Sequence, residues 1–466
     1  MARRRHTGGG FAAASLLTLA VIASGPAAAL GATASLVRNI AGGSASSSPA
    51  DLINFGGTLY FKAEDAANGG ELWKSNGTAA GTRMVRNISP GSTSSNPGQF
   101  VDFGGKLFFA AGDSAHGREL WKSDGTAAGT RLVRDIRPGN MPSNPNQLVA
   151  VGNTLYFTAT DATHGDELWK SDGTAAGTEL VKNIYPGPAG ATIAFPTKLG
   201  GKLLFGASDS TRGYELWRSN GTTAGTQMVK NINPGSGSGL IAYYGPGVFN
   251  GRFFFGANDG SDANYELWRS DGTAAGTKMI RNINPNPGAG SYPVGFTDVD
   301  GTLFFQADDG AHGPELWKTD GTPAGTRLIK DIYAGATGSY AFGFTDLSNR
   351  AYFSATSSAA GNELWRSDGT TTGTKLVRNI LPGATGSEPN GFAELAGSLF
   401  FSAYGGASTG FEPWTTNGTA SGTSLVMDVY PGGDHSDPGE LTNVGGRILF
   451  AATSPTVGRE LWKITP

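Results

Sequence analysis

The sequence predicts an all-β protein, a β-propeller of about nine four-stranded antiparallel blades, from three observations. All nine tryptophans stand in one motif, Glu-Leu-Trp or once Glu-Pro-Trp, at gaps of 48, 48, 48, 51, 49, 48, 49 and 48 residues. Each repeat contains four short runs of β-branched and aromatic residues, separated by glycine-rich turns. No long segment has the periodicity of a helix. Four strands in a repeat of this length are typical of propeller blades.

The first residues have the layout of a secretory signal peptide, which we assign to residues 1–34. Three arginines at 3–5 precede an apolar run from Phe11 to Ala23, and small residues follow. Cleavage fits the small-residue pattern after Ala29 or after Ala34. The apolar run is too short to span a bilayer comfortably. We therefore expect a secreted or cell-surface protein with no membrane insertion after processing.

Residues 35–466 form a single predicted propeller domain, in which the unit at 98–136 shows the pattern of a blade. Its first two strands meet at Gly104-Gly105, which suits the positive φ of a tight hairpin turn. The third strand carries Glu119-Leu-Trp, and an Asp-Gly-Thr turn leads to the fourth strand. The predicted blades span about 50–88, 98–136, 146–184, 195–232, 246–283, 296–332, 344–380, 391–429 and 440–464.

The two ends of the domain predict how the ring closes. A fourth strand without its blade stands at 35–41, and the chain ends on a third strand that carries Trp462. Pairing these strands completes the ninth blade and removes the open edge of a linear array. A register in which residues 36–73 already form a whole blade needs no such exchange. An open solenoid and two smaller rings are the other arrangements compatible with the repeat.

Composition excludes some partners. The net charge is −3, and removal of the three signal-peptide arginines makes it about −6. A mildly acidic surface argues against nucleic acid and against anionic membranes, because both need a basic patch. The chain has no cysteine, so its stability must come from burial and from contacts between neighbouring repeats. We expect a monomer.

The repeated motif has structural roles in this interpretation. The Asp or Asn before Gly-Thr closes an Asx-type turn, since the exchange of Asp for Asn does not suit a general acid. One Trp per blade at constant phase indicates packing between blades. The residues concerned are Trp73, Trp121, Trp169, Trp217, Trp268, Trp317, Trp365, Trp414, Trp462, Asp124, Asp172, Asp271, Asp320 and Asp368.

The Glu of the motif predicts an ion pair. It lies two residues before each Trp, and the fourth strands carry a basic residue such as Arg86 or Arg134. We expect the two to pair within or between blades. The unit with Glu-Pro-Trp at 412–414 has Met427 in place of the base, so this blade is predicted to be the weakest or most distorted.

The motif Gly-x-Glu-Leu-Trp-(Lys/Arg)-Ser-(Asp/Asn)-Gly-Thr-x-x-Gly-Thr resembles the ELWxxDGT repeat of secreted bacterial proteins. The resemblance covers practically all of 35–466, with eight full copies and a truncated ninth. That family has no established activity, so the resemblance implies an architecture and export. The Asp-Gly-Thr hairpin is also similar to the Asp-box turn of sialidase-type propellers, and the Gly-Gly-Lys-Leu-Phe-Phe strand to Kelch blades. Neither likeness implies a catalytic residue, because the Asp box is a structural turn.

One face of the predicted propeller carries the candidate ligand-binding residues. The loops between second and third strands and the linkers between blades share this face and vary from repeat to repeat. Variable loops on a rigid scaffold are where binding is usually found. The candidates are His116, Arg118, His164, Asp166, Arg212, Tyr214, Tyr265, His312 and Tyr340, with Tyr243-Tyr244 and His435 on the same face.

No metal or cofactor is predicted. Three of the histidines occupy one loop position in different blades, so the ring holds them apart. The pattern Asp-x-x-x-Gly-x-Glu at 113–119 and 161–167 leaves calcium as an alternative, although it lacks the ligand spacing of known calcium loops.

Three functions fit these observations. The first is an exported, non-enzymatic binding or adhesion scaffold for a glycan or protein ligand, such as a polysaccharide or a cell-surface partner. The second is a propeller glycoside hydrolase or lyase with carboxylates at the central mouth. The third is a purely structural envelope or matrix protein. No catalytic residue is assigned, because the sequence has no nucleophile elbow, phosphate loop or zinc motif.

Overall fold

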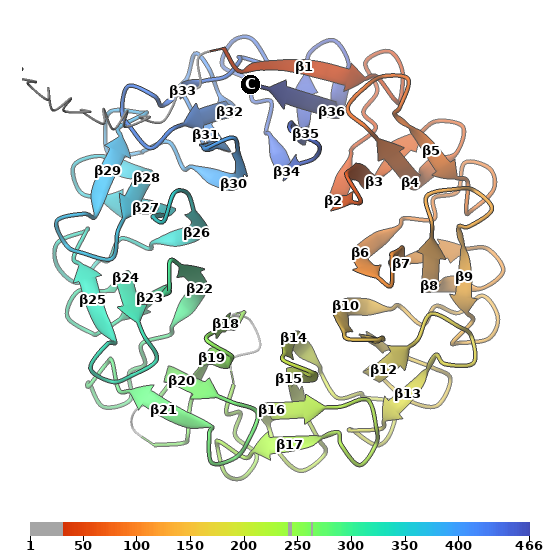
Figure 1. The fold of residues 1–466 in the computed structure, drawn as a ribbon, viewed down its shortest axis with the longest axis horizontal. Helices are drawn as coiled ribbons and strands as arrows, with labels where there is room; N and C mark the ends of the chain where they lie inside the picture. The colour runs from red at the N-terminus through yellow and green to blue at the C-terminus, as the bar shows by residue number, and fades with distance from the viewer. Residues whose placement is uncertain (1–30, 241–244, 262–263) are drawn as a thin grey trace, which may run out of the picture.

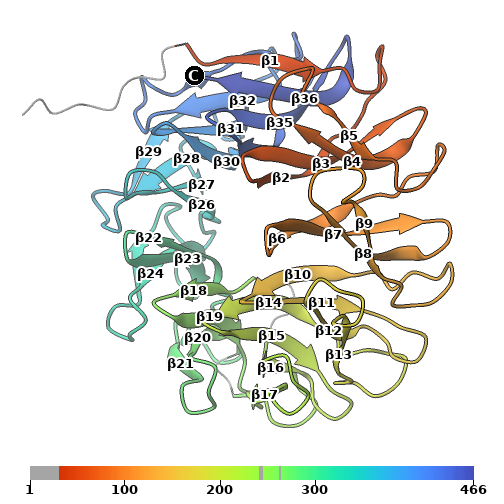
Figure 2. The same ribbon diagram turned by 45° about the vertical axis from the view of Figure 1, so that its right-hand side comes forward.

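The computed structural model describes residues 31–240, 245–261 and 264–466. These residues form 36 strands in nine four-stranded antiparallel sheets, which stand as blades around one ring (Figure 1). Figure 2 shows the same blades from an oblique side. The described residues contain no helix, and thus none able to cross a membrane. The predicted nine-bladed propeller is confirmed, and the open solenoid and the two smaller rings are wrong.

The first strand of each blade lies toward the centre of the ring, and the second strand follows outward (Figure 1). The first strands are β2 (Ala50–Phe55), β6 (Gly98–Phe103), β10 (Asn146–Val151), β14 (Ala194–Leu199), β18 (Gly247–Phe249), β22 (Val294–Val299), β26 (Phe342–Asp346), β30 (Asn390–Leu395) and β34 (Gly439–Asn443). The second strands are β3 (Thr58–Asp65), β7 (Lys106–Asp113), β11 (Thr154–Ala159), β15 (Lys202–Ser208), β19 (Arg252–Ala257), β23 (Thr302–Asp308), β27 (Ala351–Ser357), β31 (Ser398–Tyr404) and β35 (Ile448–Ser454).

The third and fourth strands complete the blades toward the outside of the ring. The third strands are β4 (Gly69–Ser75), β8 (Gly117–Ser123), β12 (Glu167–Ser171), β16 (Tyr214–Ser219), β20 (Glu266–Ser270), β24 (Pro314–Thr319), β28 (Gly361–Ser367), β32 (Phe411–Thr416) and β36 (Gly458–Thr465). The fourth strands are β5 (Arg83–Arg86), β9 (Arg131–Arg134), β13 (Glu179–Lys182), β17 (Gln227–Lys230), β21 (Lys278–Arg281), β25 (Arg327–Lys330), β29 (Lys375–Arg378), β33 (Ser424–Leu425) and β1 (Thr33–Arg38).

The ring is closed by strand β1, which joins the last blade. Blade 1 holds β2–β5, the following blades take four strands each up to β30–β33 in blade 8, and blade 9 has the order β1-β36-β35-β34. Leu36 lies opposite Trp462 and Ala34 opposite Ile464. The predicted closure is confirmed, and the register with a whole blade at 36–73 is wrong. The closing strand begins at Thr33, two residues before the predicted position at 35.

The hydrophobic core is divided among the interfaces between blades. In one cluster Val85 and Ile88 of blade 1 pack with Phe109 and Trp121 of blade 2. Trp121 is only 4% exposed. The same arrangement recurs around the ring, so each Trp holds its blade to the preceding one. The predicted packing role of the tryptophans is confirmed.

The Asp-Gly-Thr turn also has its predicted structural role. Asp124 Oδ1 accepts hydrogen bonds from the backbone N–H of Thr126, at 2.9 Å, and from its hydroxyl, at 2.7 Å. Gly125 between them has φ +85°, which favours glycine. Asn76 makes the same two contacts in blade 1, which explains why an amide replaces the acid freely.

The predicted ion pair of the motif Glu is wrong. Glu119 is fully buried, and its carboxylate accepts hydrogen bonds from Ile136 N–H, Ser143 N–H and the Ser143 hydroxyl, at 3.0, 3.0 and 2.6 Å. Both donors belong to the linker that leads to the next blade. A buried carboxylate needs several donors, and the backbone of this linker supplies them without a second charge. The Glu therefore ties each linker to its own blade.

The fourth-strand base instead joins one blade to the next. Lys230 Nζ donates to the carbonyl of Thr277 at 3.0 Å and lies 5.3 Å from the centre of the Trp268 ring. The equivalent donors are Arg38, Arg86, Arg134, Lys182, Arg281, Lys330 and Arg378, with acceptors Thr82, Thr130, Thr178, Thr226, Thr326, Thr374 and Thr423.

A second basic contact accompanies the first at these interfaces. Lys122 Nζ, on the third strand, donates to the carbonyl of Gly173 in the next blade at 2.6 Å. The equivalent contacts run from Lys74, Lys170, Arg218, Arg269, Lys318, Arg366 and Lys463 to Gly125, Gly221, Gly272, Gly321, Gly369, Gly418 and Gly77. The Asp-Gly-Thr turns thus accept hydrogen bonds from two basic side chains of the preceding blade, one on its third strand and one on its fourth.

Blade 8 lacks both bases, and the closure of the ring explains why. Met427 and Thr415 occupy the two positions, and blade 9 has no Asp-Gly-Thr turn because its fourth strand comes from the other end of the chain. Neither base would find an acceptor there. The fourth strand β33 has two residues, against four in blades 1 to 7. The predicted distortion of this blade is confirmed at its fourth strand.

Candidate functional site

The predicted histidine candidates close their own loops. His116 Nδ1 lies 3.0 Å from Asp113 and His312 Nδ1 lies 2.8 Å from Asp309. His164 pairs with Asp161 in the same way, and Arg212 with Asp209. The Asp113 carboxylate accepts a hydrogen bond from the His116 ring and so raises the pKa of His116. Because the same i, i+3 contact recurs with different residues in four blades, it serves the loop, and it brings none of these side chains together.

The other candidates lie apart in separate blades. Tyr214 is 6% exposed, so it belongs to the core of its blade and is not a surface residue. Burial raises the pKa of Asp166. Tyr265 packs its ring 5.8 Å from that of Tyr292, and Tyr340 is 54% exposed. Residues 243 and 244, two further candidates, lie outside the described residues.

Carboxylates on the first strands accept backbone hydrogen bonds. Asp298 and Glu394 cap hairpin turns, accepting the N–H groups of Gly301 and Gly397 at 3.1 and 2.9 Å, and Glu440 accepts the N–H of Leu52 in the next blade at 2.7 Å. The carboxylates with raised pKa are Asp166 and the buried motif glutamates, of which Glu167 reaches about 7 through desolvation. The motif glutamates act on the linkers, so they do not supply the acid pair of a glycoside hydrolase at the central mouth.

A metal site is also absent from the part of the chain that the structure describes, which has no group of three suitable side chains. In the loop considered for calcium, Asp113 already accepts the N–H groups of Ala115 and His116, at 2.9 and 2.7 Å. Glu119 accepts donors of the linker. The two carboxylates of this loop are therefore engaged in different directions.

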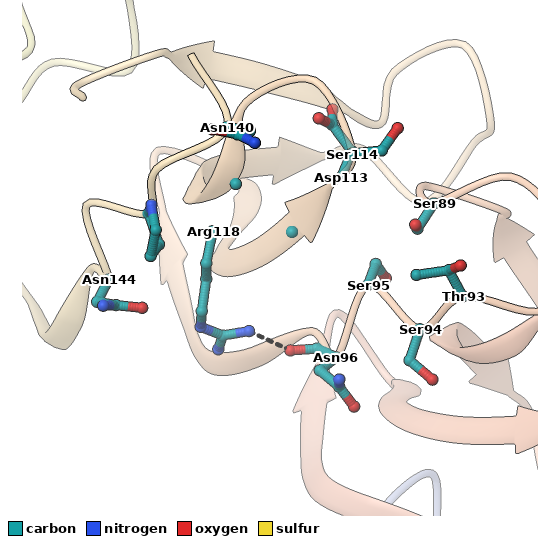
Figure 3. A pocket seen from close by; sticks show the side chains of 13 residues that line it. Ser89, Thr93, Ser94, Ser95, Asn96, Asp113, Ser114, Arg118, Asn140 and Asn144 are labelled. Atoms are coloured by element: carbon teal, nitrogen blue, oxygen red, sulfur yellow. Dashed lines mark hydrogen bonds between the residues drawn. The ribbon is translucent and has the colours of Figure 1, made fainter. Parts of the chain in front are cut away.

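Two of the nine candidates line pockets: Tyr214 lines a small apolar one within the core of its region, and Arg118 lines a larger polar one. A pocket of about 390 Å³ opens between blades 1 and 2, on the face of the linkers and the second-to-third-strand loops (Figure 3). Its walls are the linker at 87–97, the loop between β7 and β8, and the linker at 135–145. Hydroxyl and amide side chains line it, namely Ser89, Thr93, Ser94, Ser95, Asn96, Ser114, Asn140 and Asn144.

Arg118 crosses this pocket from strand β8. One of its terminal nitrogens donates to the carbonyl of Asn96 on the linker of the preceding blade (Figure 3). The side chain is half-buried, and desolvation lowers its pKa, with Asp51 acting in the opposite direction. A guanidinium has five N–H donors; among the described residues one nitrogen of Arg118 has a hydrogen-bond acceptor, and the Asp51 carboxylate lies close to the guanidinium without a hydrogen bond to it. The remaining donors can bind an anion.

The motif shapes the pocket through Gly117, which lines it, and through the buried Glu119. Glu119, next to Arg118, holds the linker at Ile136 and Ser143. Gly117 has φ +68°, and a Cβ there would lie 2.8 Å from the carbonyl of Asn140. A larger residue would push this linker away, so glycine and glutamate together place Asn140 and Asn144 beside the arginine.

This site combines one half-buried cation with many neutral hydrogen-bonding groups. The acid in its wall, Asp113, is occupied by its own loop and by His116. An Arg fork binds carboxylates and phosphates in a bidentate manner. Serine, threonine and asparagine side chains can pair with the amide groups around such an anion. The pocket therefore suits a small ligand that carries an anionic end and polar neighbours.

Sequence reasoning found Arg118 but missed its surroundings. The linkers were expected on the binding face, but Ser94, Ser95 and Asn96 were not among the candidates, although their run of hydroxyl and amide groups was an available signal. The pocket requires two linkers that are 48 residues apart in the repeat, and their approach depends on the ring. The predicted division of the loops between two faces is confirmed. A separate pocket is lined by the strand 1–2 turns at Gly104 and Gly152 and by the Asp-Gly-Thr turn at Asp172, so these two kinds of turn lie on one face.

The fold and the pocket define a nine-bladed β-propeller with a polar site between two blades. No family model matches the chain, and no curated protein matches it. Similar solved structures include the computationally designed Ika8 protein, at 16% identity and a TM-score of 0.41, covering 77% of this chain and 92% of that one.

Two peptidases are among the similar structures. A prolyl endopeptidase matches at 14% identity and a TM-score of 0.42, covering 77% of this chain and 54% of that one. Oligopeptidase B from Leishmania major matches at 12% identity and 0.43, covering 79% and 52%. The chain thus spans about half the length of these peptidases, and the likeness concerns the fold alone.

The expected function needs correction. The sequence was interpreted as an exported non-enzymatic adhesion scaffold for polysaccharide or cell-surface partners, whereas the natural proteins among the similar structures are peptidases, which share the fold alone. The loop residues expected to form a shared binding face are also spread over different blades, and three histidines and Arg212 are paired with acids of their own loops. We do not retain the adhesion scaffold or its glycan-hydrolase and matrix alternatives.

Proposed function

We propose that the protein is a substrate-receiving propeller that holds the free carboxylate end of short peptides between blades 1 and 2. The observation that carries this proposal is the half-buried Arg118 in a pocket of about 390 Å³ lined by hydroxyl and amide groups. No bond-breaking step is assigned to a residue of this chain.

The chemistry of the pocket favours a peptide end over other anions. A peptide joins its carboxylate directly to an amide N–H and C=O. The guanidinium of Arg118 pairs with the carboxylate, while the side-chain amides of Asn96 and Asn144 accept and donate to the peptide group. A free phosphate has no amide N–H and C=O beside its charge, so it satisfies the arginine and the hydroxyls but matches the asparagine amides less well than a peptide end does.

The test is binding of a library of labelled tripeptides, each made with a free and with an amidated C-terminus. Free-acid peptides bind and their amidated forms lose about 10- to 100-fold, because a charge-assisted hydrogen bond contributes about 1.5–3 kcal/mol. Arg118→Gln removes this preference. Arg212→Gln is the matched control, since that arginine is on the same face and pairs with Asp209 outside the pocket. Equal binding of both peptide forms, or an unchanged preference in Arg118→Gln, contradicts the proposal.

We further propose that the chain is exported and belongs with the ELWxxDGT repeat proteins. The signal-peptide layout lies mostly in residues 1–30, outside the described part of the chain, and supports export from sequence alone. The blades built by the Glu-Leu-Trp and Asp-Gly-Thr motifs support the repeat resemblance. Recovery of the processed protein outside the cytoplasm of its host tests export, and retention of the leader on an intracellular protein contradicts it.

A further inference from the structure

A second pocket lies directly beside the first. It measures about 320 Å³ and is lined by Ser46 of the linker that follows β1, by Glu64 and Asp65 at the end of β3, and by Ser92 and Ser94. Ser94 lines both pockets. The two pockets therefore lie on either side of the linker at 87–97, on the same face of the ring.

The second pocket has the opposite charge. Asp65 is occupied by its own loop, because its Oδ1 accepts the N–H groups of Ala67 and Asn68 at 2.9 and 2.8 Å. Glu64 is different, since its half-buried carboxylate has no hydrogen-bond donor or ion-pair partner recorded within the described residues. Each pocket thus contains one charged side chain that can bind a further group of opposite charge: Arg118 in the first pocket and Glu64 in the second.

This arrangement is not repeated by the motif. The position of Glu64 is held by Gly112 in blade 2, and that of Arg118 by Gly70 in blade 1. The charges come from variable positions in neighbouring blades, and the Ser-Thr-Ser-Ser run of the shared linker lies between them. If all repeats were identical, every pocket would contain both charges. Here the acid lies in one pocket and the base in the next, which distinguishes blades 1 and 2.

We propose that the two pockets form one site for a short peptide with a cationic group upstream of its free carboxylate. The carboxylate binds Arg118, the backbone crosses the linker at Ser94, and a lysine or arginine side chain or a free amino terminus binds Glu64. This assignment rests on the proposed carboxylate recognition and adds to it a preference for charge at the other end. It also sets the direction of the peptide, from blade 1 toward blade 2.

The experiment compares acetylated free-acid peptides in which one residue is Lys, Gln or Glu, with one to four residues between it and the C-terminus. At the best spacing Lys binds about three- to fivefold more tightly than Gln, as expected of a partly exposed ion pair, and Glu binds less tightly than Gln. Glu64→Gln makes Lys and Gln equal, and Glu64→Lys reverses the order so that Glu binds best. Glu388→Gln, which changes an exposed carboxylate on the linker between blades 7 and 8, leaves the preference unchanged.

The results separate the two proposals. If free-acid peptides bind through Arg118 but Lys, Gln and Glu peptides bind equally at every spacing, the two-pocket site is wrong and carboxylate recognition stands. If no free-acid preference exists, both proposals fail. A Lys preference that survives Glu64→Gln places the cation elsewhere and also refutes the two-pocket site. The reversal in Glu64→Lys guards against misfolding as an explanation, because a misfolded variant loses binding without inverting selectivity.

Discussion

Removing one basic contact between blades should cost a measurable amount of stability, and Lys230→Met is the sharpest case. The Nζ of Lys230 donates to the Thr277 carbonyl at 3.0 Å and lies 5.3 Å from the Trp268 ring centre. A hydrogen bond from a charged donor contributes about 1.5–3 kcal/mol. An exposed cation–π contact adds about 0.5–1 kcal/mol. Methionine keeps most of the apolar stem and the freed groups regain some water, so we expect a net loss of about 2 kcal/mol.

Stability is measured by urea unfolding, with the combined fluorescence of the tryptophans as the signal. The m value should be the same in the variant and the parent protein. For a chain of this size a loss of 2 kcal/mol corresponds to a fall in Tm of about 2 °C. The matched control is Met427→Lys, which restores the base in the blade whose neighbour has no Asp-Gly-Thr turn. We expect this variant within about 0.5 kcal/mol of the parent protein.

Two results would refute this reasoning. One is a Lys230→Met protein as stable as the parent, which would mean that the carbonyl contact and the stacked cation contribute nothing. The other is a Met427→Lys protein stabilised as much as Lys230→Met is destabilised. In that case the base would act through general surface charge, and the absent turn of blade 9 would not explain why blade 8 lacks it.

Four further predictions follow from the same structure. Glu119→Ala strands two buried donors, the Ile136 N–H and the Ser143 hydroxyl, and removes one of two acceptors of the Ser143 N–H. It lowers the free energy of unfolding by about 3–5 kcal/mol; unfolding within 1 kcal/mol of the parent contradicts this. Ala191→Ser supplies a hydroxyl that most blades already give their Glu, so the pKa of Glu167, about 7, falls. Because a raised carboxyl pKa makes stability fall as pH rises from about 4.5 to 7, this variant loses less stability across that window, as pH-dependent unfolding will show. If a signal peptidase acts, it cuts after Ala29, because Ala34 is buried within β1; N-terminal sequencing decides. Hydrogen exchange is fastest at the interface of blades 8 and 9, which lacks both basic contacts, and uniform exchange around the ring disproves this.

The motif residues were interpreted correctly where their role is local. The turn at Asp124 depends on atoms two residues away, and the packing of Trp121 depends on a period that the sequence displays directly. Glu119 was misassigned because an acid and a base on adjacent strands suggest an ion pair. The carboxylate in fact accepts hydrogen bonds from backbone N–H groups of a linker. Every residue other than proline has such a group, so the sequence does not show which of them act as donors.

The candidate site was found only in part for a related reason. His116, His164 and His312 were attractive as unusual residues on variable loops, yet each is satisfied within its own loop by an acid three residues earlier. Arg118 matters because most of its N–H donors have no hydrogen-bond acceptor among the described residues. Glu64 matters because its carboxylate has neither a donor nor an ion-pair partner among them. Only coordinates show whether a charged side chain is already satisfied.

The sequence by itself determined the number of blades, the closing strand and the turn chemistry of this protein. The number of blades and the closing strand follow from the motif, which occurs nine times along the chain. The turn chemistry follows from backbone preferences that act over a few residues. The tertiary structure decided which base contacts which blade, why Met427 replaces one of them, and where two pockets of opposite charge meet at Ser94. Those outcomes depend on curvature, because closing the ring brings together linkers that are 48 residues apart and removes the turn that a ninth pair of bases would need.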